Sequence, residues 1–351
     1  MDADLRRPGA GRRWGSIRVQ ATVEADPLGA AYLQLLLLSD STLRLAVPLV
    51  FCALAGLFSE RSGVVNIALE GKMLGGAFAA AAMAQLTGSA LAGLAAAVAF
   101  STSLALVHGF ATVTHRGDQV VSGMAINVLV AGLGPTLADA WFHEAGRVPV
   151  TAPGARFAPI DLPLAAELRS VPILGPLYAE VLSGHNPLVY LAFASVPVVA
   201  WVLYRTRFGL RLRAVGEHPE AVDTAGISVS AMRYRALIVA GLLTGLAGAY
   251  LSIAQNASFL RDMTAGKGYL ALAALIFGKW RPVPALAACL LFAFADALQA
   301  RLQGVQLPYL GEIPTEAIQA LPYLLTILLL AGFVGRAIAP AAIGKPYVKE
   351  Q

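Results

Sequence analysis

The sequence predicts an all-α polytopic integral membrane protein, and three observations carry this prediction. Of 351 residues, 57% are hydrophobic and only 13% are charged, whereas about a quarter of the residues of a soluble chain are charged. The mean hydropathy is +0.67. Apolar runs also recur along the chain at lengths that approach those of membrane-spanning helices. This composition excludes disordered, collagen-like and ordinary soluble proteins.

About ten hydrophobic helical segments are expected, and eight is the alternative count because several segments are shorter than a straight spanning helix of about 20 residues. The segment at 28–38 has no small-residue cleavage site after it, so we expect it to be retained and not removed as a signal peptide. The segments are 28–38, 43–58, 72–86, 90–110, 120–141, 188–204, 236–254, 269–281, 283–300 and 318–335.

Basic residues predict the orientation, because loops rich in lysine and arginine stay on the cytoplasmic side. Residues 1–27 hold five arginines and read as a disordered basic cytoplasmic tail before a transmembrane domain at 28–335. The 205–235 loop holds six arginines and is expected inside, as is the 336–351 tail; the 142–187 and 302–317 loops are expected outside. An even number of crossings places both termini in the cytoplasm, provided that 28–38 counts as one crossing.

The stretch Gly216–Ile227 in the basic loop has the signals of a short helix. Pro219 suits the first turn, Glu220 suits the positive N-terminal end, and Gly226 suits a left-handed stop. This helix is either an interfacial connector or a docking element for a soluble partner. The candidate coupling residues are Glu217, His218, Pro219, Glu220, Val222, Asp223 and Gly226, with Val222 and Ile227 as apolar anchors.

Polar residues inside apolar runs are costly in a membrane and tend to face a cavity or one another. Asn66, Glu70, Asn127 and Asp296 are therefore candidates for a translocation path, with hydrogen bonding between helices as the alternative role. Asn66 and Glu70 are four residues apart and would share a face of one helix. Gly241 and Gly245 have the spacing that allows two helices to approach closely.

Motifs for catalysis are absent from the sequence. There is no phosphate-binding Gly-x-x-x-x-Gly-Lys-Ser/Thr loop, no His-Glu-x-x-His and no Gly-x-Ser-x-Gly. Cys52 and Cys289 lie in apolar runs, so neither a disulfide framework nor a cysteine metal site is expected. The arginines flank segments without interleaved aromatic residues, which argues against nucleic acid as a partner. We therefore expect no enzyme activity, metal or cofactor on this chain.

Three ordered stretches, 58–71, 216–227 and 263–299, resemble permease subunits of ABC transporters of the nucleoside and simple-sugar type, within the branched-chain amino-acid/ribose permease superfamily. Lys72 departs from the apolar pattern of that family, and the 142–187 loop has no clear counterpart in it. The resemblance implies a bundle like that of type II importers, in a prokaryotic cytoplasmic (inner) membrane. It implies four partners: membrane lipid, a second and different permease chain, an external substrate-binding protein, and a cytoplasmic ATPase that carries ATP and Mg²⁺.

The predicted function is the translocation subunit of an ATP-driven importer for nucleosides or simple sugars. Rocking of the helix bundle would alternate access to the path, and the 216–227 helix would transmit movement from the ATPase. Two alternatives remain open at this point. An ion-gradient-driven secondary transporter could use Glu70, Asp139 and Asp296 as proton carriers, whereas a membrane-embedded enzyme would need a catalytic constellation that the sequence does not offer.

Overall fold

The computed structural model describes residues 27–144, 146–163, 167, 171, 174–303, 306–307, 311–312, 320, 324, 327 and 337–349. The chain divides into two compact units. One unit comprises residues 1–41 and 161–184, and the other comprises 42–160 and 185–351. The second unit is called the main unit below. It contains the main hydrophobic core, the 216–227 stretch and the polar candidates for a translocation path.

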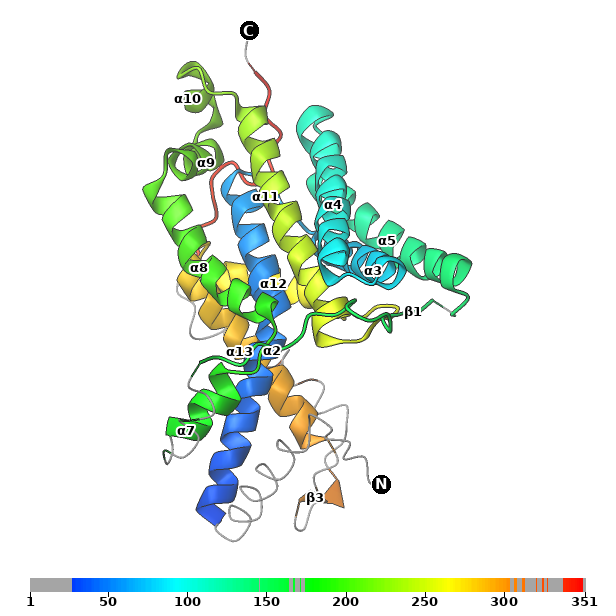
Figure 1. Ribbon diagram of the computed structural model, residues 1–351. Coiled ribbons are helices and arrows are strands. Elements are labelled where there is room, and N and C mark those ends of the chain that lie inside the picture. Colours follow the sequence, from blue (N-terminus) through cyan, green and yellow to red (C-terminus); the bar gives the residue numbers. More distant parts are fainter. Residues whose placement is uncertain are drawn as a thin grey trace, which may run out of the picture. The chain divides into compact units, whose positions relative to one another are not determined.

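The first helix, α2, runs without interruption from Pro27 to Arg61 (Figure 1). The expectation that 28–38 and 43–58 are two crossings is therefore wrong. Between them the chain has no glycine or proline, and the hydroxyls of Ser39 and Ser41 donate to helix carbonyls four residues earlier, at 2.8 Å each. Such bonds let polar residues continue a helix. The expected ten crossings therefore become nine. An odd number no longer places both termini on the same side of the membrane.

Further helices of the main unit follow α2 along the chain, and the long 142–187 stretch separates α5 from α8 (Figure 1). They are α3 (Leu69–Thr87), α4 (Ala90–Gly109) with the π-helical turn η1 (Phe110–Thr114), α5 (Gln119–Phe142), α8 (Pro187–Arg205), α9 (Arg207–Glu217), α10 (Pro219–Thr224), α11 (Val229–Ala249) with η3 (Tyr250–Gln255), α12 (Lys267–Phe277) and α13 (Pro282–Leu302).

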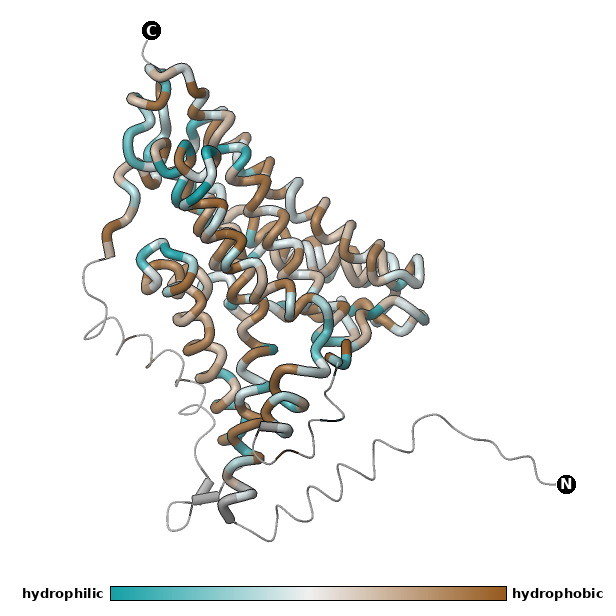
Figure 2. Tube along the Cα trace, turned by 60° about the vertical axis from the view of Figure 1, so that its left-hand side comes forward, coloured by the Kyte–Doolittle hydropathy of each residue, from teal (hydrophilic) through white to brown (hydrophobic). Residues whose placement is uncertain are grey.

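Six helices among the described residues are long and apolar enough to cross a membrane. They are Ala31–Arg61, Ala90–Thr114, Gln119–Phe142, Pro187–Arg205, Val229–Gln255 and Pro282–Leu302. Figure 2 shows hydrophobic residues along these helices and hydrophilic residues near the C-terminal end of the described chain. The predicted class, an all-α polytopic membrane protein, is confirmed. The expected segment at 318–335 and the tail at 1–26 lie outside the described residues, apart from single positions.

Strands are short wherever the structure describes them. β1 (Val148–Pro149) pairs antiparallel with β2 (Ser258–Phe259), and β3 (Gln306–Leu307) pairs with β4 (Gly311–Glu312). The predicted external loop at 142–187 thus contains β1, and it also contains α7 (Leu174–Pro176) and the π-helical turn η2 (Leu177–Leu182). Phe259 of β2 is fully buried and packs edge-on against Phe78 of α3 at 5.4 Å between ring centroids.

Glycines of α11 allow this helix to lie directly against α4 and α3, as the sequence predicts for Gly241 and Gly245. A Cβ atom at either glycine would lie 2.6 Å from a Cα atom of α4. At Gly248 it would lie 2.4 Å from the Met73 carbonyl oxygen of α3. The buried hydroxyls of Ser101 and Thr244 are 2.6 Å apart and join α4 to α11. The close packing at the centre of the main unit therefore depends on small residues.

Replacing Gly245 with leucine should destabilise the bundle by about 1–3 kcal/mol or more, because the new side chain has backbone in its way and cannot be accommodated by a rotamer change. Thermal unfolding of the detergent-purified protein measures this effect. Gly132→Leu is the matched control, since no atom lies within 4 Å of the Cβ position at this exposed glycine of α5. Equal melting temperatures for the two variants would contradict the packing argument.

Candidate functional site

The predicted short helix is present as α10, between α9 and α11. Pro219 occupies its first turn, and Gly226, with a φ of +78°, follows the C-cap residue Ala225. The Gly226 and Ile227 amides donate to the carbonyls of Asp223 and Val222, at 2.9 and 3.2 Å. These bonds end the helix in the left-handed manner expected from the glycine. The local prediction from the sequence is confirmed, whereas the docking role stays a prediction.

Two details of the 205–235 prediction need correction. Val222 is buried, with 6% of its surface exposed, and belongs to the core of the main unit. It anchors α10 to the helix bundle and is not available to a partner, because a short amphipathic helix buries its apolar face on its own protein. The loop is also shorter than expected: α11 begins at Val229, so Arg233 and Arg235 are helical, and Arg233 is buried. Glu217, His218 and Glu220 are exposed.

A pocket of about 290 Å³ lies where the N-termini of α3 and α12 meet beside α5. Glu70, in the first turn of α3, joins these two ends. Its two carboxylate oxygens accept hydrogen bonds from the Gly266 and Gly268 amides, at 2.8 and 2.6 Å. The amides at a helix N-terminus have no partner within the helix and carry a partial positive charge. Glu70 therefore fixes the start of α12 and forms part of the pocket wall.

Asn127 of α5 also lines the pocket and connects three elements. Its side-chain oxygen accepts from the Gly71 amide at 2.8 Å. Its side-chain nitrogen donates to the Ile67 carbonyl at 3.0 Å and to the Tyr269 hydroxyl at 2.9 Å. Asn127 thus forms hydrogen bonds between helices, which is the alternative role considered for it, and it also lines the pocket. Tyr269, in the first turn of α12, is 42% exposed and was not among the residues singled out from the sequence.

Asn66 and Asp296 occupy other places. Asn66 lies in the turn before α3, so the expectation that it shares a helical face with Glu70 is wrong. Gly63, with a φ of +88°, turns the chain after α2, and α3 starts only at Leu69. Asn66 is fully buried, and its side-chain oxygen accepts from Nζ of the buried Lys72 at 2.6 Å. Asp296 lies half-buried on α13, and neither residue lines the pocket.

The Asn66–Lys72 pair explains the lysine that departs from the apolar family pattern. Beside it, the ring nitrogens of the buried His108 on α4 contact the Val65 carbonyl and the Ser122 hydroxyl, each at 3.0 Å. Lys72 of α3, His108 of α4 and Asn127 of α5 therefore all bond the chain between α2 and α3. Among the described residues, no three His, Cys, Asp or Glu side chains form a group that could hold a metal ion.

Comparison with known proteins agrees with this architecture. Residues 38–330 match the family described as branched-chain amino acid transport system / permease component. The chain is 41% identical to the guanosine ABC transporter permease protein NupQ of Bacillus subtilis, over 88% of this chain and 95% of NupQ. It is 38% identical to the nucleoside ABC transporter permease protein NupC of Lactococcus lactis, over 87% and 95% of the two chains.

A third relative is the putative glucose ABC transporter permease protein TsgC13 of Haloferax volcanii, which is 33% identical over 89% of this chain and 98% of its own length. The alternative of an ion-gradient-driven transporter is not favoured by these relatives, which are permease proteins of ABC transporters. The chain therefore belongs to the family of branched-chain amino acid transport system permease components, as a transmembrane permease subunit of an ABC importer.

Proposed function

We propose that this permease subunit conducts nucleosides, and that they pass through the pocket between α3, α5 and α12. The observation that carries the proposal is the meeting of two helix N-termini, joined by Glu70, at the wall of a 290 Å³ pocket. Transporters commonly place substrate sites where helices are interrupted and their ends converge. The relatives named for guanosine and nucleosides support the substrate class.

The lining of the pocket suits a planar, hydrogen-bonding solute that must leave again. Tyr269 presents a partly exposed ring on which a base or a sugar ring can stack. Asp262 and Thr264 add polar groups to the same wall. Both oxygens of Glu70 already accept backbone amides, so the carboxylate holds the wall together and offers little further binding. A path of this kind binds its substrate weakly, which favours passage.

The remaining expectations from the sequence belong to the same proposal. ATP and Mg²⁺ act on a separate ATPase subunit that docks on α10, and this chain performs no catalysis. A second, different permease chain completes the path, and an external binding protein delivers the substrate. The membrane is the prokaryotic cytoplasmic membrane, with α9, α10 and the C-terminal tail inside, since the Ala341 and Ala342 amides bond Glu217 and Gly216 of α9. The four arginines that precede α10, at positions 205, 207, 211 and 213, support this orientation.

Substitutions at Tyr269 test the path. In proteoliposomes containing the complete complex, Tyr269→Leu should lower nucleoside uptake by about tenfold, which corresponds to the loss of a stacking contact of about 1–1.5 kcal/mol. Tyr269→Phe keeps the ring and should stay within about threefold of the wild type, since it loses only one hydrogen bond of roughly 0.5 kcal/mol. Normal uptake by the leucine variant would exclude the pocket from the path. In a separate assay, competition of nucleoside uptake by ribose and by free bases would report which part of the nucleoside is recognised.

A further inference from the structure

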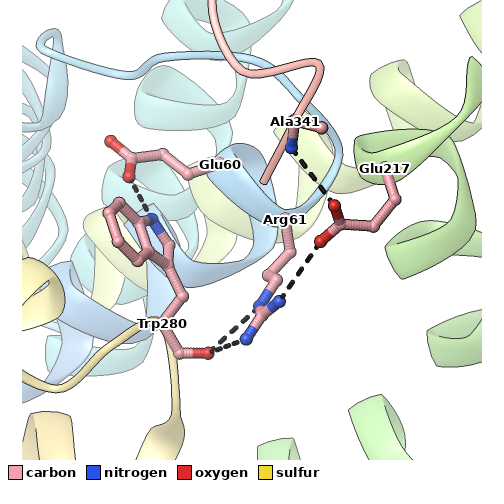
Figure 3. A network of polar contacts seen from close by, with 5 residues as sticks. All are labelled: Glu60, Arg61, Glu217, Trp280 and Ala341. Atoms are coloured by element: carbon pink, nitrogen blue, oxygen red, sulfur yellow. Dashed lines mark hydrogen bonds and ion pairs between the residues drawn. The ribbon is translucent and has the colours of Figure 1, made fainter. Parts of the chain in front are cut away.

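Four chain segments that are distant in sequence meet around Arg61, at the end of α2 (Figure 3). The Arg61 guanidinium donates to the Trp280 carbonyl through Nε and Nη2, at 3.1 and 2.8 Å. Its Nη1 lies 3.9 Å from Oε1 of Glu217, and Oε2 of Glu217 accepts from the Ala341 amide at 3.2 Å. Arg61 therefore joins the last residue of α9 to the turn between α12 and α13.

Backbone contacts hold the same segments close together. A Cβ atom at Gly216 would lie 2.2 Å from the Arg61 carbonyl oxygen, so the end of α9 lies directly on the end of α2. The Ala342 amide donates to the Gly216 carbonyl at 2.9 Å. On the other side, the Trp280 indole donates to Glu60 at 2.6 Å, and both side chains are buried. The set of Glu60, Arg61, Glu217, Trp280 and Ala341 is called the Arg61 cluster below.

Two short elements lead from the Arg61 cluster to the pocket. One is the turn from Arg61 to Glu70, which begins at the cluster and ends at the pocket wall. The other is α12, whose C-terminal end precedes Trp280 and whose N-terminal end carries Gly266, Gly268 and Tyr269. The 11 residues of α12 span about 16 Å. Since Glu70 bonds Gly266 and Gly268, the two elements are tied together at both ends.

We propose that Arg61 and Glu217 are positioning residues for transport: they convert a displacement of α9 and α10 into a displacement of the two pocket walls. The proposal rests on the proposed function of α10 and of the pocket. Coupling between distant sites requires an element whose arrangement both sites influence, and the closed loop of α12 and the Arg61–Glu70 turn is such an element. Arginine suits the position because its planar guanidinium holds two partners in fixed directions, which a lysine ammonium does not.

The test compares uptake with ATP hydrolysis in the complete reconstituted complex. Arg61→Lys keeps the charge but loses the paired donation to the Trp280 carbonyl. We expect ATP hydrolysis to stay within about twofold of the wild type while nucleoside uptake falls by about tenfold, so that fewer molecules move per ATP. Arg147→Lys makes the same chemical change at an exposed position near β1 and should leave the ratio unchanged. A merely structural role would lower uptake and hydrolysis together.

Glu217→Gln supplies a second, milder variant on a side chain that is 47% exposed, so the test stands even if Arg61→Lys fails to assemble. It should lower the ratio of uptake to hydrolysis by about threefold. The double variant should lower the ratio of uptake to hydrolysis no further than Arg61→Lys alone does, because both substitutions disrupt the same connection between α9 and the turn after α12. An unchanged ratio in Glu217→Gln, or losses that multiply in the double variant, would overturn the proposal. If the wild-type complex moves no nucleoside, the proposed function fails and not the coupling role.

Discussion

Glu70→Ala is expected to reduce nucleoside uptake by about a hundredfold while the complex still assembles. The variant leaves the Gly266 and Gly268 amides without their acceptor. Both bonds are partly buried. A fully buried donor left unsatisfied costs about 1–3 kcal/mol, so we expect a combined cost of about 2.7 kcal/mol for the two, which is about a factor of a hundred in a population. The first turn of α12, with Tyr269, would then lose its fixed position against α3. Uptake by proteoliposomes measures the loss.

Two controls separate this effect from a general loss of a helix cap. Glu70→Gln keeps one acceptor and should be intermediate. Asp118 caps α5 in an ordinary way, because one carboxylate oxygen accepts from the Val121 amide at 2.8 Å on the surface. Asp118→Ala should lower the free energy of unfolding by about 1 kcal/mol and should leave uptake nearly unchanged. If Glu70→Ala and Asp118→Ala had the same uptake, Glu70 would have no special part in the path.

Gly226→Val is expected to uncouple the ATPase, with a loss of uptake of about tenfold at a nearly constant melting temperature. No atom lies within 4 Å of the Cβ position at Gly226, so steric contact is not the cause. The strain comes from the φ of +78°, which costs a β-branched residue roughly 1–2 kcal/mol. The end of α10 would reorient, and the ATPase would dissociate or hydrolyse ATP without transport.

Gly226→Asn is the matched variant, because asparagine tolerates the left-handed conformation better than valine. Its uptake should remain close to that of the wild type. Co-purification of the ATPase, together with uptake per ATP, measures both variants on the same preparation. Equal and normal values for Val and Asn would mean that α10 is a simple connector between α9 and α11.

Local signals explain what the sequence could predict. Pro219 and Gly226 define α10 within a few residues, and both act on the backbone of their own segment. The spacing of Gly241 and Gly245 likewise predicts a close helix contact, because one helix face is enough to display it. The class of the protein follows from composition, which depends on no tertiary contact.

Long-range contacts explain what the sequence could not predict. Glu70 bonds an amide 196 residues away, and no local pattern reports that partner. Residue spacing predicts that Asn66 shares a helix face with Glu70, but it does not show that Gly63 turns the chain and that α3 begins only at Leu69. Lys72 departs from an apolar pattern in the sequence, and its contact with Asn66, which accounts for it, is formed only in the fold. No sequence pattern indicates that Arg61 and Trp280 are partners, since the bond joins the Arg61 side chain to a backbone carbonyl, which every residue carries.

The most direct test of the account is the energy source for uptake. The complex proposed above, with this chain and the proposed partner permease, ATPase and binding protein, is reconstituted in sealed proteoliposomes with labelled guanosine outside. ATP on the ATPase side should drive accumulation, and a non-hydrolysable ATP analogue should abolish it whatever proton or sodium gradient is imposed. Accumulation driven by such a gradient without ATP hydrolysis would contradict the account.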